Sequence, residues 1–149
     1  MIDRFERFSL AISEIHRCLV GISSTEMKKH GLSGAQARYL IIMNRLRLGI
    51  TAARLATICQ RNKAEVSRAI ASLEKKGLAE KENNPKNYRT LIRLTDKGRE
   101  IAENISERAK KAVENVGGFM TTEERESFYD TLDLLAANLV KIDKDGLPD

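Results

Sequence analysis

The sequence lacks tryptophan and has few aromatic residues, prolines and cysteines. Of its 149 residues, 5% are aromatic and two are proline, a composition that excludes fibrous and low-complexity chains. Cys18 and Cys59 are too few for a disulfide framework and have no partners at metal-ligand spacing, so we expect reduced thiols, no metal and no other cofactor. No apolar run reaches the roughly 18 residues that span a bilayer, and residues 1–17 lack the apolar segment of a signal peptide. We therefore expect a cytoplasmic protein without a membrane partner.

What is present is a charged chain of one domain's length. Hydrophobic residues make up 42% of the sequence and charged residues 32%, a balance typical of an ordered protein. The net charge of +5 is unevenly distributed, because residues 51–99 hold twelve lysines and arginines against five acidic residues, whereas residues 100–149 hold six against twelve. The positive middle segment predicts a surface for a polyanion. A solvated, salt-tolerant surface explains the same charge equally well.

Apolar spacing and capping residues predict a mostly α fold with a small β hairpin. Apolar residues recur at steps of three and four in each predicted helix, and Ser33, Thr51, Asn62, Thr95 and Thr121 are suitable N-caps. The predicted helices cover residues 2–29, 33–48, 51–59, 62–77, 95–116 and 121–142, and the strands cover 78–82 and 89–94. The order is α-α-α-α-β-β-α-α.

Residues 51–94 have the pattern of a winged helix-turn-helix. Two short helices are separated by a three-residue break at 60–62, and a basic hairpin follows them. In the second helix we expect Val66, Ile70 and Leu73 to be buried, while small and basic residues on its other side let the backbone approach base edges. The candidate DNA-binding residues are Thr51, Arg54, Asn62, Lys63, Ala64, Ser67, Arg68, Lys86, Tyr88 and Arg89. A helical hairpin with a charged, solvated face is the alternative interpretation.

Residues 32–101 resemble the MarR family of bacterial and archaeal transcriptional regulators. The matching elements are AQxxxL at 35–40, LA at 55–56, VSRAIxxLEKKGL at 66–78, NP at 84–85 and LTxKG at 94–98. The resemblance implies one domain over residues 1–149, with a winged helix-turn-helix lobe at 33–99 and dimerisation helices at 1–30 and 100–149. It further implies a homodimeric, sequence-specific regulator of transcription, most often a repressor. Such a regulator binds a pseudo-palindromic operator in double-stranded DNA, and a small-molecule effector or an oxidant releases it from the DNA.

The predicted wing departs from the family pattern. The family's D-P-x-D-R-R reads NPKNYR at residues 84–89, so that both acids are amides and the first arginine is Tyr88. Either Arg89 or Lys86 is then the candidate for the cation that enters the minor groove, because a narrow minor groove attracts cations. Otherwise the wing supplies affinity for phosphates only, and the protein is a non-specific or architectural DNA-binding protein.

Three further residues are weaker candidates for regulatory sites. Arg38 and Arg45 are candidate anchors for an anionic effector such as an aromatic carboxylate, although solvent-facing or phosphate-facing arginines are the simpler interpretation. Cys18 is a candidate redox sensor, against the alternative of a small buried residue. The sequence has no nucleophile motif, no glycine-rich phosphate loop and no histidine set suited to acid–base chemistry. We therefore assign no catalytic residue and predict that the protein is not an enzyme.

Overall fold

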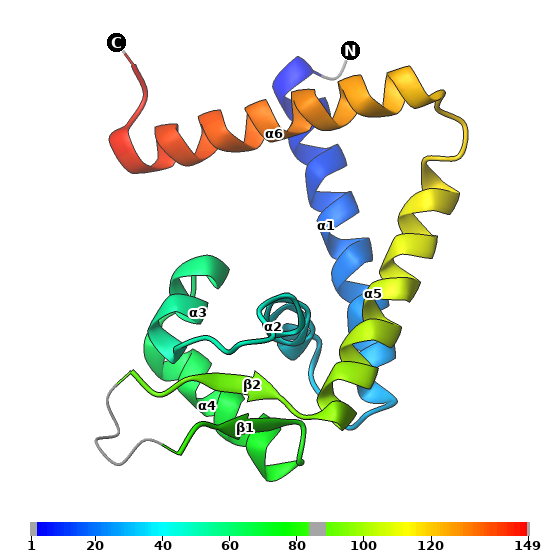
Figure 1. The fold of residues 1–149 in the computed structure, drawn as a ribbon. Helices are drawn as coiled ribbons and strands as arrows, with labels where there is room; N and C mark the ends of the chain where they lie inside the picture. Colours follow the sequence, from blue (N-terminus) through cyan, green and yellow to red (C-terminus); the bar gives the residue numbers. More distant parts are fainter. Residues whose placement is uncertain (1–2, 84–88, 149) are drawn as a thin grey trace. The chain divides into compact units, whose positions relative to one another are not determined.

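A computed structural model describes residues 3–83 and 89–148 of the chain, which contain six helices and two strands (Figure 1). The elements are α1 (Arg4–Lys28), α2 (Gly34–Arg45), α3 (Ala52–Cys59), α4 (Lys63–Lys75), β1 (Ala79–Lys81), β2 (Ile92–Leu94), α5 (Asp96–Val116) and α6 (Thr122–Asp145). Their order confirms the predicted α-α-α-α-β-β-α-α arrangement and the mostly α fold class.

Helix α2 is shorter than the sequence predicts. We expected it to continue to about Leu48, but it ends at Arg45 and Leu46 leaves the helical conformation, with φ −102° and ψ 66°. Gly49 then turns the chain with φ 108°, and the amide of Ile50 donates to the carbonyl of Ile92 at 2.9 Å. Because this pairing draws the segment onto the edge of the sheet, Leu48 is left 88% exposed. The apolar periodicity therefore overestimated the length of α2.

The two strands form an antiparallel hairpin, as predicted, but each is only three residues long. Ala79 pairs with Leu94 and Lys81 pairs with Ile92. An isolated bridge between Ile50 and Ile92 adds a third segment to the sheet. Strand β1 follows directly from the turn at the end of α4, and the hairpin lies beside that helix (Figure 1).

The hydrophobic core lies between α2, α3, α4, the sheet and the first half of α5. Its side chains come from every element of this part of the chain, including the last turn of α1. The largest fully buried residues are Met27, Leu40, Met43, Ile50, Leu55, Val66, Ile70, Leu73, Leu78 and Leu94. Burial of this many large apolar side chains fixes α3 and α4 against the rest of the lobe.

The chain forms two compact units, Met1–Ala109 and Lys110–Asp149. The second unit contains the end of α5 and all of α6, where Thr121 Oγ1 accepts from the amide of Glu124 at 3.2 Å and the Glu124 carboxylate accepts from the amide of Thr121 at 2.8 Å. The two hydrogen bonds form a capping box and confirm the N-cap predicted at Thr121. Among the described residues, no helix has the length and apolar content needed to cross a membrane.

Candidate nucleic-acid interface

Helices α3 and α4 and the turn between them form the predicted helix-turn-helix. Thr51 Oγ1 accepts a hydrogen bond from the amide of Arg54 at 3.2 Å, and Asn62 Oδ1 accepts from the amide of Glu65 at 2.8 Å. Both predicted N-caps are therefore confirmed. Gln60 adopts the left-handed conformation, with φ 53°, and this reverses the chain between the two helices. The exposed first turn of α4 directs its amides outward, where the helix dipole favours a phosphate.

The two sides of α4 differ as its sequence predicts. Val66, Ile70 and Leu73 are at most 1% exposed and pack into the core. The residues at the predicted DNA-facing positions Lys63, Ala64, Ser67, Arg68 and Ala71 are all exposed. The buried side holds the helix in place while the short side chains of the outer side leave room for a close approach. We refer to α4 as the recognition helix.

A groove separates the recognition helix from the start of α2. The groove has a volume of about 440 Å³ and is lined by residues of α2 and α4, with Arg68, Ser72 and Lys76 on the α4 side and Ser33, Gln36 and Tyr39 among those on the α2 side. Gln36 Oε1 accepts from the amide of Ser33 at 3.0 Å, which orders the first turn of α2. The start of α2 and the side chains of Glu65, Arg68, Ser72 and Lys76 therefore line one concave surface, which includes one acidic group.

Arg61, in the turn of the motif, is a candidate that the sequence analysis missed. Its Nη1 lies 3.7 Å from Oε1 of Glu65, and the two side chains are 58% and 39% exposed. Asn62 therefore caps the helix through its own side chain, while the Glu65 side chain pairs with Arg61. The spacing of four residues was the signal for this pair. The ion pair holds a guanidinium beside the first turn of the recognition helix.

The wing is confirmed as a hairpin, but only part of its candidate site can be placed. Lys86 and Tyr88 lie outside the described residues. Arg89 is exposed and has φ 49°, a left-handed conformation that turns the chain into β2. The hairpin continues one pair beyond the strands, because the amide of Glu82 donates to the carbonyl of Leu91 at 2.8 Å.

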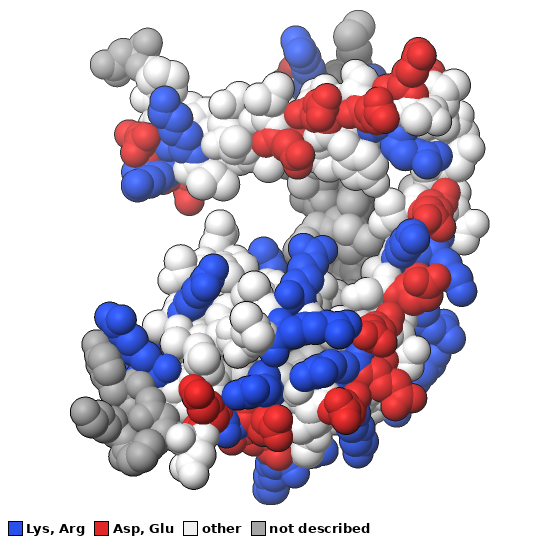
Figure 2. Space-filling view, in the orientation of Figure 1, with Lys and Arg blue, Asp and Glu red and all other residues white. Residues whose placement is uncertain are grey.

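Positive charge is concentrated on this lobe. Lysine and arginine side chains outnumber acidic ones across its visible face, whereas a row of acidic side chains follows α6 in the second unit (Figure 2). Thr51 is half-buried and Arg54 is exposed at the start of α3. The charge difference predicted between the middle and the end of the sequence thus appears as a difference between the two units.

The candidate regulatory residues lie in separate places. Arg38 and Arg45 are exposed on α2, and neither lines the groove beside α4. Cys18 is exposed, so the alternative of a buried residue is wrong, and its Sγ lies 3.7 Å from Nη2 of Arg17. Cys59 is buried as expected, and burial raises the pKa of its thiol.

A metal centre is not formed by the part of the chain that the structure describes. No group of three or more histidine, cysteine or acidic side chains is close enough there to hold an ion.

These features define a winged helix-turn-helix, and part of its sequence matches the model of a known family. Residues 30–89 match the sequence model of the MarR family. A Bacillus subtilis protein named YdgJ, an uncharacterized HTH-type transcriptional regulator, is 32% identical over 81 residues, which are 54% of this chain and 49% of that protein. The match spans about half the length of this curated relative.

Solved structures share the fold of the chain. A MarR family transcriptional regulator from Listeria monocytogenes, crystallised with a 26mer DNA, is 27% identical and has a TM-score of 0.79, covering 100% of this chain and 99% of that one. The Staphylococcus aureus MepR–DNA complex is 19% identical, with a TM-score of 0.77, and covers 88% of this chain and 97% of that one. Residues 30–89 of this chain thus match the sequence pattern of the MarR family, and the chain shares the winged helix fold of these solved structures.

Proposed function

We propose that this protein is a sequence-specific, DNA-binding regulator of transcription that acts as a homodimer on a pseudo-palindromic operator. The observation that carries the proposal is the recognition helix, whose buried side is fixed in the core while its outer side presents Ser67, Arg68 and two alanines. The Listeria monocytogenes relative was crystallised with DNA, which supports the same partner here. Such a regulator acts where the DNA is, in the cytoplasm.

The recognition helix suits the major groove for a chemical reason. The guanidinium of Arg68 matches the two acceptors that guanine presents there, and the hydroxyl of Ser67 can donate or accept. The first-turn amides after Asn62 and the guanidinium of Arg61 are suited to the adjacent phosphates, which position the helix without reading sequence. The proposal thus assigns base contacts to Ser67 and Arg68 and phosphate contacts to Asn62 and Arg61.

A second copy of the chain would cover apolar side chains that a monomer exposes. Helix α1 exposes Phe5 at 74% and Ile15 at 54%, and α6 exposes Leu134 at 66% and Val140 at 56%. Large apolar side chains exposed along a helix are typical of an interaction site. A two-fold dimer through α1 and α6 would present two recognition helices to half-sites roughly 10 base pairs apart. Sedimentation should give twice the mass of the chain.

An effector would act by preferring one dimer geometry over another. Arg38 and Arg45 stay candidates for its anchors because both guanidinium groups are exposed on α2. Their substitution should then abolish release from DNA by the effector without abolishing DNA binding.

The architectural alternative is tested by Arg68→Ala. Binding is measured by fluorescence anisotropy on a selected duplex and on variants that differ from it at one base pair each. If Arg68 reads a base, discrimination falls by about 1–3 kcal/mol at one position of each half-site. Lys75→Ala is the matched control, because it removes one charge from the exposed last turn of the same helix and should leave discrimination unchanged. A uniform loss with Arg68→Ala would favour the architectural function.

A further inference from the structure

Two buried polar side chains of α2 line the groove beside the recognition helix. Gln36 is 8% exposed and Tyr39 is 3% exposed, yet both line the groove. They lie three residues apart and therefore share one face of α2. Because a helical side chain leans toward the start of its helix, the Tyr39 ring leans toward the first turn of α2.

Both side chains have hydrogen-bond donors without an acceptor. Oε1 of Gln36 accepts from the amide of Ser33 at 3.0 Å, which leaves the Nε2 protons as the available part of this side chain. Neither Nε2 of Gln36 nor the hydroxyl of Tyr39 has an acceptor in residues 3–83 and 89–148. Buried donors are nearly always hydrogen-bonded in folded proteins. The pair therefore indicates an acceptor that comes from outside the chain.

The charges around the groove favour an anion as that acceptor. The Glu65 carboxylate belongs to the lining, but its Oε1 lies 3.7 Å from Nη1 of Arg61, so its charge is compensated. Arg68 and Lys76 then give the lining an excess of positive charge. The start of α2 adds the positive end of its helix dipole.

The Tyr39 hydroxyl keeps its proton at neutral pH and is therefore a donor. Burial, and to a smaller extent the negative charge of Glu65, raise the pKa of Tyr39. Even an unperturbed tyrosine loses its proton only at about pH 10. The side chain thus presents a neutral O–H group to the groove.

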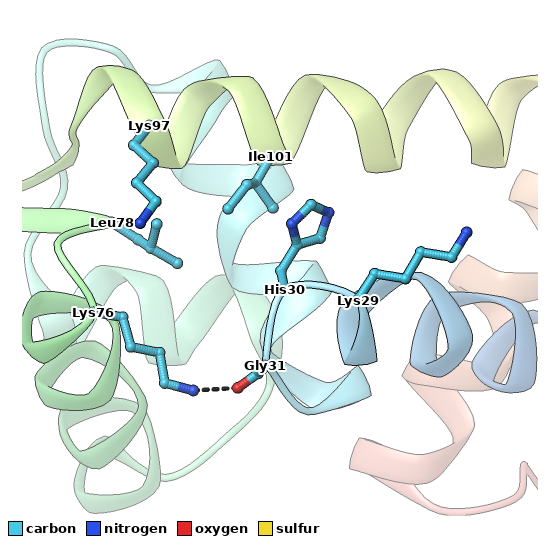
Figure 3. A pocket seen from close by; sticks show the side chains of 7 residues that line it. All are labelled: Lys29, His30, Gly31, Lys76, Leu78, Lys97 and Ile101. Carbon is cyan, nitrogen blue, oxygen red and sulfur yellow. Dashed lines mark hydrogen bonds between the residues drawn. The ribbon is translucent and has the colours of Figure 1, made fainter.

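Contacts at both ends of the groove fix α2 against α4. A Cβ added at Gly34 would lie 2.2 Å from Oγ of Ser24, so α2 begins directly against α1. Lys76, at the end of α4, donates a hydrogen bond to the carbonyl of Gly31, three residues before α2 (Figure 3). The donors of α2 are thus held in place before a ligand binds, which lowers the ordering cost of binding.

We propose that this groove binds one phosphate of the DNA backbone through the Tyr39 hydroxyl and the Gln36 side-chain amide. Ser72, in the lining, lies ten residues after Asn62, roughly 15 Å along the helix. This phosphate is therefore a different one from the phosphate assigned to Asn62. Phosphates bound at two separate points set the position of the recognition helix without reading sequence. The inference rests on the proposed function, because it adds residues to the same DNA interface.

Tyr39→Phe tests the hydroxyl by fluorescence anisotropy on the selected duplex and on an unrelated duplex of equal length. Affinity for both should fall about tenfold, the effect of one hydrogen bond to a charged group. Because the lost group is neutral, the dependence of affinity on salt should match that of the wild type. Tyr129→Phe is the matched control, since it removes an exposed hydroxyl from the second unit and should change nothing. Wild-type affinity in Tyr39→Phe, or an equal loss in both variants, would overturn the proposal.

Stability separates a phosphate contact from a structural role. The Tyr39 hydroxyl makes no hydrogen bond within the described residues, so the urea midpoint of Tyr39→Phe should be no lower than that of the wild type. A lower midpoint would assign the hydroxyl to the core and overturn the proposal.

Gln36→Glu tests the second donor while keeping the helix cap. Glutamate at this third helical position still offers an oxygen to the amide of Ser33, but it places a negative charge where the Nε2 protons were. Affinity for both duplexes should fall further than in Tyr39→Phe. Wild-type affinity in Gln36→Glu would show that no phosphate lies beside this side chain.

The phosphate is located with variants of the selected duplex in which neutral methylphosphonate replaces one phosphate of each half-site at a time. At the contacted position, Tyr39→Phe should lose less affinity than the wild type loses, because its hydrogen bond is already absent. At all other positions the two proteins should lose equally. Equal losses at every position would overturn the proposal.

The same measurements separate this inference from the proposed function. If the wild type binds both duplexes equally and Tyr39→Phe weakens both, sequence-specific regulation fails and the phosphate contact stands. If the wild type discriminates between the duplexes and Tyr39→Phe binds as the wild type does, the regulator stands and the contact is wrong. Absence of binding to any duplex would refute both.

Discussion

Gly98 should contribute to stability, because α5 begins directly against the backbone of Leu78, the residue before β1. A Cβ added at Gly98 would lie 2.0 Å from the carbonyl oxygen of Leu78 and 3.0 Å from its carbonyl carbon. That oxygen cannot move freely, because it accepts from the amide of Thr95 at 3.0 Å while Thr95 Oγ1 donates to the carbonyl of Gly77 at 2.7 Å. To restore an ordinary contact, α5 and the hairpin must separate by about 1 Å.

The magnitude for Gly98→Ala follows from opposing effects. Alanine favours the helical conformation over glycine by about 1 kcal/mol. Against this, overpacking in a constrained position costs about 1–3 kcal/mol, and weakening the hydrogen bond from Thr95 to Leu78 costs about 1 kcal/mol more. We therefore expect a net loss of about 1–3 kcal/mol in the free energy of unfolding.

Urea unfolding followed by circular dichroism, at one fixed protein concentration, measures this loss as a lower midpoint with unchanged slope. Gly21→Ala is the matched control, because Gly21 lies within α1 and a Cβ there meets nothing within 4 Å. That substitution should raise stability by about 0.5–1 kcal/mol. If Gly98→Ala unfolds at the same midpoint as the wild type or a higher one, the close approach of α5 to Leu78 is wrong.

Two further predictions follow from the pKa shifts. The pKa of Glu26 is lowered in the folded chain, chiefly by the hydrogen bond from Lys29. The ionised Glu26 carboxylate therefore contributes its full stabilisation at neutral pH. This stabilisation is lost as the pH falls from about 4.3, the pKa of an unperturbed glutamate, through the lowered pKa. The difference in unfolding free energy between wild type and Glu26→Gln should thus be larger at pH 7 than at pH 3. A pH-independent difference would contradict the lowered pKa of Glu26. Burial raises the pKa of the Cys59 thiol, so a thiol reagent should modify Cys59 only after the protein unfolds. Cys18 is exposed in the single chain and should react rapidly in the folded monomer. Rapid modification of both thiols would contradict the burial of Cys59.

The helix-turn-helix was predictable because its signals are local. Thr51 and Asn62 are N-caps by residue type, and the buried positions of α4 follow the helical period. The end of α2 was not predictable from the same signals, since Leu46 and Leu48 continue the apolar pattern. What ends the helix is the pairing of Ile50 with Ile92, a contact between residues distant in sequence.

The site was predictable only in its local part. Lys63, Ser67 and Arg68 were identified because they share one side of a single helix. A hollow lined by Lys29, Lys76 and Lys97 was not predicted, because these residues lie after the ends of α1 and α4 and at the start of α5, and no spacing in the sequence brings them together.

The central claim is that the recognition helix reads DNA sequence. Its most direct test is selection of random duplex DNA by the purified protein at near-physiological salt, followed by sequencing of the bound fraction. The account predicts enrichment of a pseudo-palindrome whose half-sites are roughly 10 base pairs apart. DNA retained without any enriched sequence, with affinity that falls steeply as salt is raised, would show that the lobe binds phosphates alone and would contradict the claim.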